Sequence, residues 1–164
     1  MGSLKPLETL KKCSLQFQVE ELKDVFNEMK PYFKAHYDEL ATFKDKIPKV
    51  DVDGLFYARL ESAGCLHVVT ARDEARLVGY YVGAVLPQPH YKNIICASAD
   101  LYYLAPEYRK AQNGVMFLLF IQDSLKERGV QWVIMGTKMN KDLGELYRAL
   151  GYEKTDEVWR KWLA

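Results

Sequence analysis

The sequence has little cysteine, no apolar leader and no long apolar run. Its three cysteines are Cys13, Cys65 and Cys96, an odd number without metal-ligand spacing, so neither a disulfide framework nor a metal site is expected. No apolar stretch followed by a cleavage site stands at the start, and together these features predict a cytoplasmic protein. The longest apolar run, residues 115–121, is far shorter than the roughly 20 residues that cross a bilayer, so no membrane partner is expected.

An excess of charge of one sign is also missing. Lys and Arg total 23 against 22 Asp and Glu, a net charge of +1, whereas proteins that bind a phosphate backbone are usually strongly basic. Nucleic acid is therefore not expected as a partner. There is no serine-, proline- or glutamine-rich tract, and 49% of the 164 residues are hydrophobic. This composition predicts that residues 1–164 fold as a single domain.

The first two thirds of the chain change from a helical to a strand-like periodicity. Apolar residues recur every three or four positions between residues 19 and 43, which predicts one or two helices with Pro31 as a break point. A strand is predicted before them and a short helix ending near Gly64 after them. The period then becomes two, and the predicted antiparallel strands cover residues 66–72, 76–86 and 94–104.

The remainder of the chain predicts one crossover and a closing pair of strands. A mostly apolar helix at residues 115–128 ends at Gly129, and residues 131–135 are so apolar that they predict a strand buried on both faces. A second helix is predicted at residues 141–150 and a strand pair at residues 152–162. This order predicts a mixed α/β (α+β) domain with a mostly antiparallel, twisted sheet flanked by helices.

The most informative segment is the predicted turn between the third antiparallel strand and the following helix, residues 104–115. Unpaired amides at a helix N-terminus and the helix dipole favour a phosphate group, and a nearby arginine such as Arg109 adds a charge-assisted bond. The same residues are also typical of an ordinary surface loop that carries a basic side chain. The turn alone therefore indicates anion binding without establishing it.

Two segments resemble the GNAT superfamily of N-acyltransferases. The family motif is valine-x-proline-glutamate-x-arginine-x-x-glycine-x-glycine or alanine, and residues 104–114 read LAPEYRKAQNG, with Gln112 in place of the first glycine and Gly114 as the second. Downstream, the family's asparagine, tyrosine and glycine-aromatic pair match Asn140, Tyr147, Gly151 and Tyr152 in spacing. The layout is also similar to phage and prophage acetyltransferase-like sequences whose substrate is unassigned.

The resemblance implies a sheet splayed at an acyl-CoA site, with acetyl-CoA as cosubstrate, no metal, and transfer of the acetyl group to an amine by direct attack. A backbone N–H near the end of the third antiparallel strand would polarise the thioester carbonyl, and the turn would hold the pyrophosphate. The residues expected at the cofactor are Tyr103, Leu104, Arg109, Lys110, Ala111, Gln112, Asn113, Gly114, Val115 and Asn140.

Three residues are candidates for proton transfer. By analogy with the family, Tyr147 would protonate the departing thiolate, although a tyrosine packed in the core fits the same pattern. Asp100 interrupts an apolar strand and is the candidate base, while a hydrogen-bonded strand aspartate is the plain alternative. His90, in a loop, is the second candidate base, because histidine is a common general base in enzymes. The expected walls of the acceptor pocket include Phe56, Tyr57 and Tyr81.

Two further hypotheses concern turnover and assembly. Because Gln112 replaces a motif glycine, a non-catalytic acyl-CoA-binding or sensor module is the alternative to an enzyme. The acceptor amine is not identified by any of these residues. Trp159 and Trp162, in the predicted closing strands, make a homodimer one reading, and closure of the domain's own core is the other.

Overall fold

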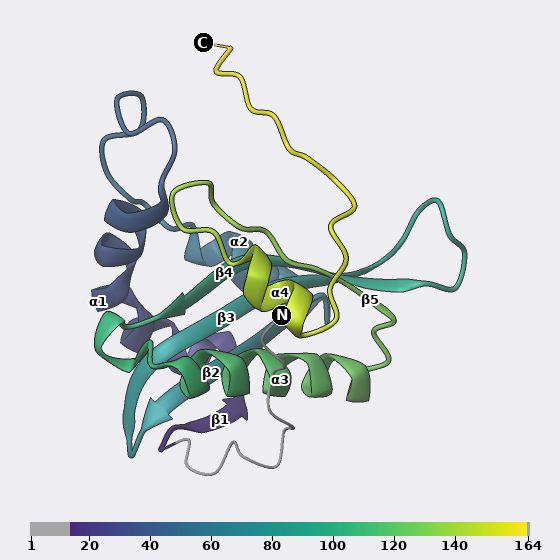
Figure 1. Cartoon of the computed structure of the whole chain (residues 1–164), viewed down its shortest axis with the longest axis horizontal. Coiled ribbons are helices and arrows are strands. Elements are labelled where there is room, and N and C mark those ends of the chain that lie inside the picture. Colours follow the sequence, from purple (N-terminus) through teal and green to yellow (C-terminus); the bar gives the residue numbers. More distant parts are fainter. Residues whose placement is uncertain (1–13, 164) are drawn as a thin grey trace, which may run out of the picture.

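The chain forms a twisted sheet with helices on both faces (Figure 1). The computed structural model describes residues 14–163. In chain order the elements are β1 (Gln16–Val19), α1 (Leu22–Leu40), α2 (Gly54–Ser62), β2 (Leu66–Asp73), β3 (Arg76–Pro87), β4 (Ile95–Leu104), the 3₁₀ turn η2 (Pro106–Tyr108), α3 (Ala111–Glu127), β5 (Trp132–Ile134) and α4 (Gly144–Ala149). The strands lie in the order β1-β2-β3-β4-β5, antiparallel except for the parallel pair β4–β5. The predicted fold class is confirmed.

Helix α1 covers one face of the sheet. Its buried residues Leu22, Val25, Met29 and Phe33 follow the helical period and pack on a cluster that includes side chains of β2, β3 and β4. Pro31 lies inside the helix without ending it, so one helix stands where one or two were predicted. Because proline has no N–H, the carbonyl of Asn27, four residues earlier, loses its helical hydrogen bond. Pro31 is on the exposed side of the helix, where water can bond to that carbonyl, and this limits the loss of stability.

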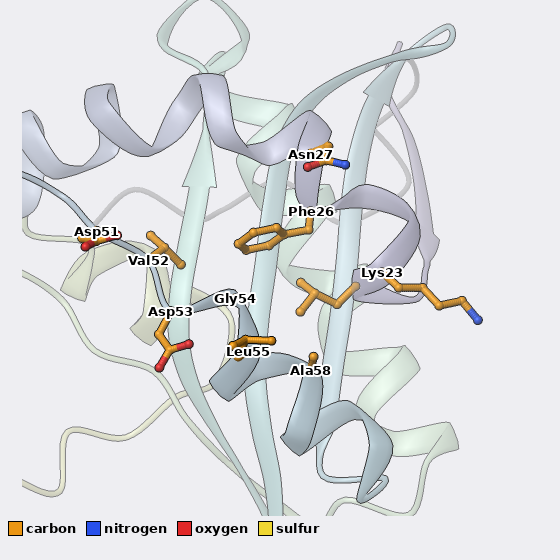
Figure 2. A pocket seen from close by; sticks show the side chains of 10 residues that line it. Lys23, Phe26, Asn27, Asp51, Val52, Asp53, Gly54, Leu55 and Ala58 are labelled. Atoms are coloured by element: carbon orange, nitrogen blue, oxygen red, sulfur yellow. The ribbon is translucent and has the colours of Figure 1, made fainter.

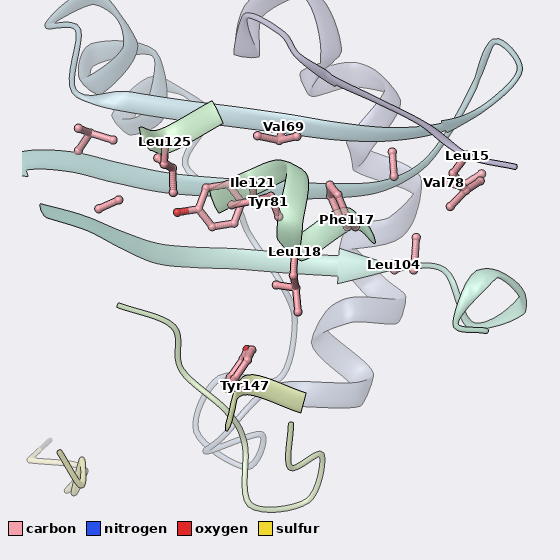
Figure 3. Packing of buried hydrophobic residues seen from close by; sticks show 13 residues of the cluster. Leu15, Val69, Val78, Tyr81, Leu104, Phe117, Leu118, Ile121, Leu125 and Tyr147 are labelled. Atoms are coloured by element: carbon pink, nitrogen blue, oxygen red, sulfur yellow. The ribbon is translucent and has the colours of Figure 1, made fainter. Parts of the chain in front are cut away.

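Helix α3 covers the other face. Figure 3 shows Phe117, Leu118, Ile121 and Leu125 of this helix packed over the strands. The ring of Phe117 stacks on Phe17 of β1 at a centroid separation of 5.3 Å. The helix begins at Ala111, earlier than the predicted residue 115. The turn after β4 therefore passes directly into the first helical turn, which brings its amides close to the end of the strand.

The pairing of β3 with β4 contains a bulge. Val82 pairs with Leu101 and Gly83 pairs with Ala99, which leaves Asp100 as the extra residue of β4. A β-bulge bends the strand locally and redirects a side chain. Here the redirected side chain is the carboxylate that the sequence analysis selected as a candidate base.

Two predictions about the end of the chain are wrong. β5 was expected to be buried on both faces, but it is the edge strand, and Trp132 and Ile134 are 39% and 45% exposed. Residues 152–162 were expected to form a strand pair, but they carry no strand, and the chain after α4 extends away from the sheet (Figure 1). The two errors are connected. Because residues 152–162 do not form strands, no strand in the described chain covers the outer edge of β5.

Membrane and cysteine expectations can be examined in the same residues. No helix within residues 14–163 has the length and apolar character needed to span a bilayer. Cys65 and Cys96 are free thiols, and Cys13 lies outside the described residues.

We expect Gly83→Ala to destabilise the fold through overpacking. A Cβ atom at this position would stand 2.7 Å from Cζ of Tyr81, whose ring is fully buried and cannot swing aside. Overpacking of this kind costs about 1–3 kcal/mol. Gly136→Ala is the matched control, since a Cβ there meets nothing within 4 Å. Urea denaturation of both variants measures the difference, and equal stability would contradict the assigned packing of Tyr81.

Candidate functional site

The site is built around an open edge of β4. This strand pairs with β3 along its whole length but with β5 only from Cys96 to Ser98. From residue 99 to residue 104 its other edge has no strand partner in the described chain. Ala105 N donates to Val78 O at 2.8 Å, so the neighbouring amide of Leu104 points the opposite way, because successive residues of a strand face opposite sides. An extended ligand on this edge would therefore meet the Leu104 N–H.

The turn after β4 presents helix amides to the same edge. Lys110 is the N-cap of α3, and its side chain makes no capping hydrogen bond. Asn113 closes the turn by donating its side-chain amide to Tyr108 O at 3.0 Å. Apart from the adjacent residues and the backbone of the helix, the atom nearest to a Cβ on Gly114 would be the Tyr102 hydroxyl oxygen, at 4.0 Å. The start of α3 therefore has the amides and the space that a phosphate group requires.

Gln112 is accommodated in this turn without backbone strain. It lies within α3 and is not among the residues with positive φ. The left-handed conformation that favours glycine is therefore not needed at this position. The substitution for the motif glycine changes the side chain at the turn but leaves the backbone amide in a regular helical position.

Arg109 points toward α1 rather than toward the start of α3. Its terminal nitrogens donate to both carboxylate oxygens of Glu39, at 2.5 and 2.6 Å, and its Nε donates to Leu104 O at 2.6 Å. The guanidinium also lies over the ring of Tyr103, with its central carbon 5.4 Å from the centroid. The pair with Arg109 holds the pKa of the Glu39 carboxyl below its usual value. Arg109, which the motif predicted to be a cofactor ligand, therefore links β4 to α1 in this structure.

The loop between β5 and α4 joins the same carboxylate. Lys141 lies 3.2 Å from Glu39 Oε1, and Asn140, another expected cofactor ligand, donates its side-chain amide to Glu39 O at 3.3 Å. Glu39 therefore connects three segments that border the open edge: α1, the turn before α3, and the loop after β5. No sequence pattern singled out this residue.

Asp100 lies at the bulge, on the α1 and α2 side of β4. Its carboxylate accepts a hydrogen bond from the Tyr57 hydroxyl of α2, and burial and this carboxylate raise the pKa of Tyr57. The tyrosine thus stays a proton donor at any physiological pH. Of the three aromatic walls expected for an acceptor pocket, the structure brings Tyr57 to the candidate base, whereas Tyr81 packs in the cluster on the other face and Phe56 is half exposed.

An aromatic cluster beside Asp100 includes a histidine that sequence reasoning missed. His36 of α1 lies with its ring centroid 5.1 Å from Tyr103, and its Nδ1 is 3.0 Å from the Tyr80 hydroxyl. The rings of Tyr80 and Tyr103 stack at 5.6 Å. Burial lowers the pKa of His36 to about 4, while Glu39 and Asp100 act in the opposite direction. His36 falls near the end of an amphipathic helix, where its position alone carries no sign of a site.

Tyr147 lies on the other side of the sheet from Asp100. Its side chain belongs to the cluster under α3 and α4 (Figure 3), and its hydroxyl donates to Gly136 O at 3.1 Å. Burial raises its pKa to about 12, so the hydroxyl remains protonated. His90 is exposed in the loop between β3 and β4, which precedes β4 and so lies at the opposite end of the strand from Leu104. The structure therefore places Asp100 and Tyr147 on opposite faces of the sheet and leaves His90 away from the open edge.

A separate cavity lies between α1 and α2 (Figure 2). Its volume is about 680 Å³, and Phe26, Val52, Asp53, Gly54 and Ala58 are among the residues that line it. None of the predicted site residues lines this cavity. In residues 14–163 no group of three or more His, Cys, Asp or Glu side chains is placed to hold a metal ion.

Comparison with known proteins identifies the fold. No family model matches the sequence, and no curated protein matches it significantly. An aminoglycoside acetyltransferase from an uncultured soil metagenomic sample, solved with trehalose, is 16% identical with a TM-score of 0.71, over 92% of this chain and 95% of that one. A ribosomal-protein-alanine N-acetyltransferase from Brucella melitensis biovar Abortus 2308 is also 16% identical with a TM-score of 0.71, over 92% and 98%.

A third solved structure contains the expected cosubstrate. It is a predicted acetyltransferase from Clostridium acetobutylicum with acetyl-CoA, 15% identical with a TM-score of 0.65, over 90% of this chain and 95% of that one. At these identities the comparisons establish a shared fold, and they confirm the fold that the GNAT resemblance implied. None of these three structures supports the narrower likeness to phage and prophage sequences.

We expect stability to fall between about pH 7 and about pH 5 because two histidines are neutral in the folded chain. Burial lowers the pKa of both His36 and His67 to about 4 from the usual 6.5. As the pH falls, the unfolded chain therefore binds protons at these two imidazoles that the folded chain does not bind. This contribution to stability is complete above the unfolded pKa and is lost as the pH falls toward 4, by at most about 1.4 kcal/mol per pH unit for each histidine.

Urea denaturation across this pH range measures the slope. Carboxyl groups whose pKa is lowered in the folded chain, such as that of Glu39, have a pKa of 4.5 in the unfolded chain. Their contribution to stability therefore changes mainly below pH 5. His67→Gln and His36→Gln should each remove about half of the slope. A slope that is unchanged in both variants would show that these imidazoles are not the groups that titrate.

Proposed function

We propose that this protein is a member of the GNAT superfamily that transfers the acetyl group of acetyl-CoA to an amine by direct attack. The observation that carries the proposal is the open edge of β4 between residues 99 and 104, which ends at the uncapped start of α3. An extended, amide-containing arm that ends in a pyrophosphate fits this combination of a strand edge and a helix N-terminus. The free thiols of Cys65 and Cys96 fit a cytoplasmic location.

The cofactor would be held mainly by main-chain groups. The Leu104 N–H would face the thioester carbonyl or the pantetheine amides, and the amides of Ala111 and Gln112 in the first turn of α3 would face the pyrophosphate. Lys110 is exposed beside them and would add positive charge. Arg109 would support this arrangement by fixing Leu104 O and α1, so we assign it a positioning role in place of the direct phosphate contact expected from the motif.

Asp100 would accept the proton of the attacking amine. It is exposed at the bulge, and its bond from Tyr57 orients one carboxylate oxygen while the other is left for the amine or for a bridging water. As the amine nitrogen forms its bond to the thioester carbon, its proton passes to this carboxylate. The backbone N–H groups of the open edge stabilise the negative charge that develops on the carbonyl oxygen.

Tyr147 would supply the proton for the departing sulfur. When the carbon–sulfur bond breaks, the thiolate takes the hydroxyl proton of Tyr147, which solvent then replaces, and the products are the amide and free CoA. The raised pKa keeps the hydroxyl protonated before the reaction. The acid and the base therefore approach the reacting carbon from opposite faces of the sheet.

One observation favours a second candidate function, a non-catalytic acyl-CoA-binding module. The Arg109 guanidinium already makes three hydrogen bonds to Glu39 and Leu104, so less of its charge is available for the cofactor. Such a module would bind acetyl-CoA without turnover. The thermal midpoint would rise with acetyl-CoA in both cases, and only release of thiol separates the two functions.

The test of the proposed activity is thiol release from acetyl-CoA with a panel of small amines, polyamines, aminoglycosides and peptide N-termini. We expect release with at least one amine and a decrease of about 100-fold or more in turnover for Asp100→Asn, because this change keeps the shape and removes the base. Tyr57→Phe retains the carboxylate and should lose much less. Binding without release for every amine would support the sensor, and absence of binding by calorimetry would exclude both functions.

Tyr147→Phe separates the proposed acid from a packing role. The ring still fills the cluster, so the free energy of unfolding should change by no more than about 1 kcal/mol, the net value of one hydrogen bond. Turnover should fall about 10-fold to 100-fold while the affinity for acetyl-CoA is retained, because the hydroxyl acts only as the thiolate leaves. Native turnover in this variant across the pH range would show that Tyr147 is a core tyrosine only.

A further inference from the structure

The loop between β5 and α4 is held against the end of α1. Lys141 lies 3.2 Å from Glu39 Oε1, and Asn140 donates its side-chain amide to Glu39 O at 3.3 Å. Lys138 lies across the same loop, where its carbonyl accepts from Lys141 N at 2.9 Å. Glu39 follows His36 by three residues, about one helical turn, and the charge of Lys138 acts on the pKa of His36. The loop therefore places Lys138 beside the histidine of the aromatic cluster.

The last residues of the described chain bring a second cation to this loop. Trp162 contacts the ring of Phe43, which follows α1, at a centroid separation of 5.9 Å. Arg160 precedes Trp162 by two residues, and burial together with the charge of Arg160 lowers the pKa of Lys138. Within residues 14–163 no carboxylate forms an ion pair with either cation, and the carboxylate of Glu39 is already paired twice. Two neighbouring cations without a counter-ion, one of them half-buried, favour an anion beside them.

His36 adds a neutral hydrogen-bond donor to the two cations. Its Nδ1 is 3.0 Å from the hydroxyl of Tyr80, which is fully buried and has no other hydrogen-bond partner in residues 14–163. A buried hydroxyl donates its proton where it can, so Nδ1 accepts and the imidazole proton is on Nε2. This Nε2–H has no partner in the described chain. The charges of Asp100 and Lys138 both act on the imidazole, so His36 lies within electrostatic range of the candidate base and of the cations.

We propose that the acceptor amine carries an anionic group, a carboxylate or a phosphate, which binds to Lys138, Arg160 and the Nε2–H of His36 while its amine lies at Asp100. The inference rests on the proposed acetyl transfer and narrows the acceptor of that reaction. A carboxylate or phosphate accepts charge-assisted hydrogen bonds from an ammonium, a guanidinium and an imidazole N–H at once. A polycation such as a polyamine would bring further positive charge to the same two cations, which disfavours it.

Pairs of amines that differ in the anionic group test the proposal in the thiol-release assay. Phosphoethanolamine is compared with ethanolamine, and β-alanine with β-alaninamide, so the two pairs separate a phosphate from a carboxylate. We expect kcat/KM to be about 10-fold or more higher for the anionic member of at least one pair. This advantage should shrink as salt is added, because ions screen exposed charges. Release that is equal or faster with the neutral member of both pairs would overturn the proposal.

Lys138→Gln and Arg160→Gln remove the two cations while keeping much of each side chain. Lys138→Gln should raise the KM of the anionic amine about 10-fold and Arg160→Gln about 3-fold, because the more exposed charge is better screened by solvent. The affinity for acetyl-CoA should not change. Lys92→Gln is the matched control, since Lys92 is exposed in the loop between β3 and β4. A preference that is unchanged in both variants would overturn the proposal, and weaker binding of acetyl-CoA with that result would assign the cations to the cofactor.

A binding measurement separates this proposal from the proposed activity. The NMR signal of the His36 imidazole, identified by its loss in His36→Gln, is followed during titration with phosphoethanolamine and with β-alanine. We expect a shift that needs about 10-fold more ligand in the double variant of Lys138→Gln and Arg160→Gln. A shift without thiol release would contradict the proposed activity and still support the anion site. Thiol release from neutral amines without any shift would overturn the anion site and leave the activity in place.

Discussion

The unequal pairing of β4 is the constraint on which the candidate site depends. β3 holds this strand along its whole length, whereas β5 holds only Cys96 to Ser98. The strand is thus rigid on one side and open on the other for the rest of its course. The open side exposes main-chain amides at a fixed position inside a folded sheet, where water is already partly excluded. A ligand with its own amides would replace the missing strand at little cost in ordering, because β4 is already in place.

Glu39 links the segments that border the open edge of β4. The bidentate bond from Arg109 links α1 to the turn before α3, and Lys141 and Asn140 link the loop after β5 to the same residue. The partly buried carboxylate of Glu39 has two cationic partners, Arg109 and Lys141, so its charge is not left unpaired. Arg109 also holds β4, since its Nε donates to the carbonyl of Leu104. Loss of either partner of the Arg109–Glu39 pair would remove this link between the turn before α3 and the end of α1.

Much of the fold could be predicted from the sequence because its signals are local. The helical period of α1 and the alternation in β2 and β3 depend on residues near one another, and the turn before α3 has a specific motif. Asp100 was selected because a charged residue is unusual in an otherwise apolar strand. The bulge explains how the strand accommodates it. His36 and Glu39 could not be selected, since only the tertiary fold brings the end of α1 to β4.

The errors at the end of the chain arise from a different physical source. The sequence of β5 is apolar enough for a central strand, but whether a strand is central is decided by its neighbours. Residues 152–162 contain the apolar side chains of a strand pair but have no strand partner within the described chain. A strand needs a neighbour to satisfy its main-chain groups, so local composition predicts the tendency without identifying where the partner is.

The shortness of β5 sets the length of the open edge at the candidate site. β5 runs only from Trp132 to Ile134 and pairs with Cys96 to Ser98 of β4, so the edge of β4 from residue 99 to residue 104 has no strand partner in the described chain. A longer β5 would pair with this edge and close it, because neighbouring strands satisfy each other's N–H and C=O groups. The residue at which β5 ends therefore decides how much of β4 is open to an extended ligand.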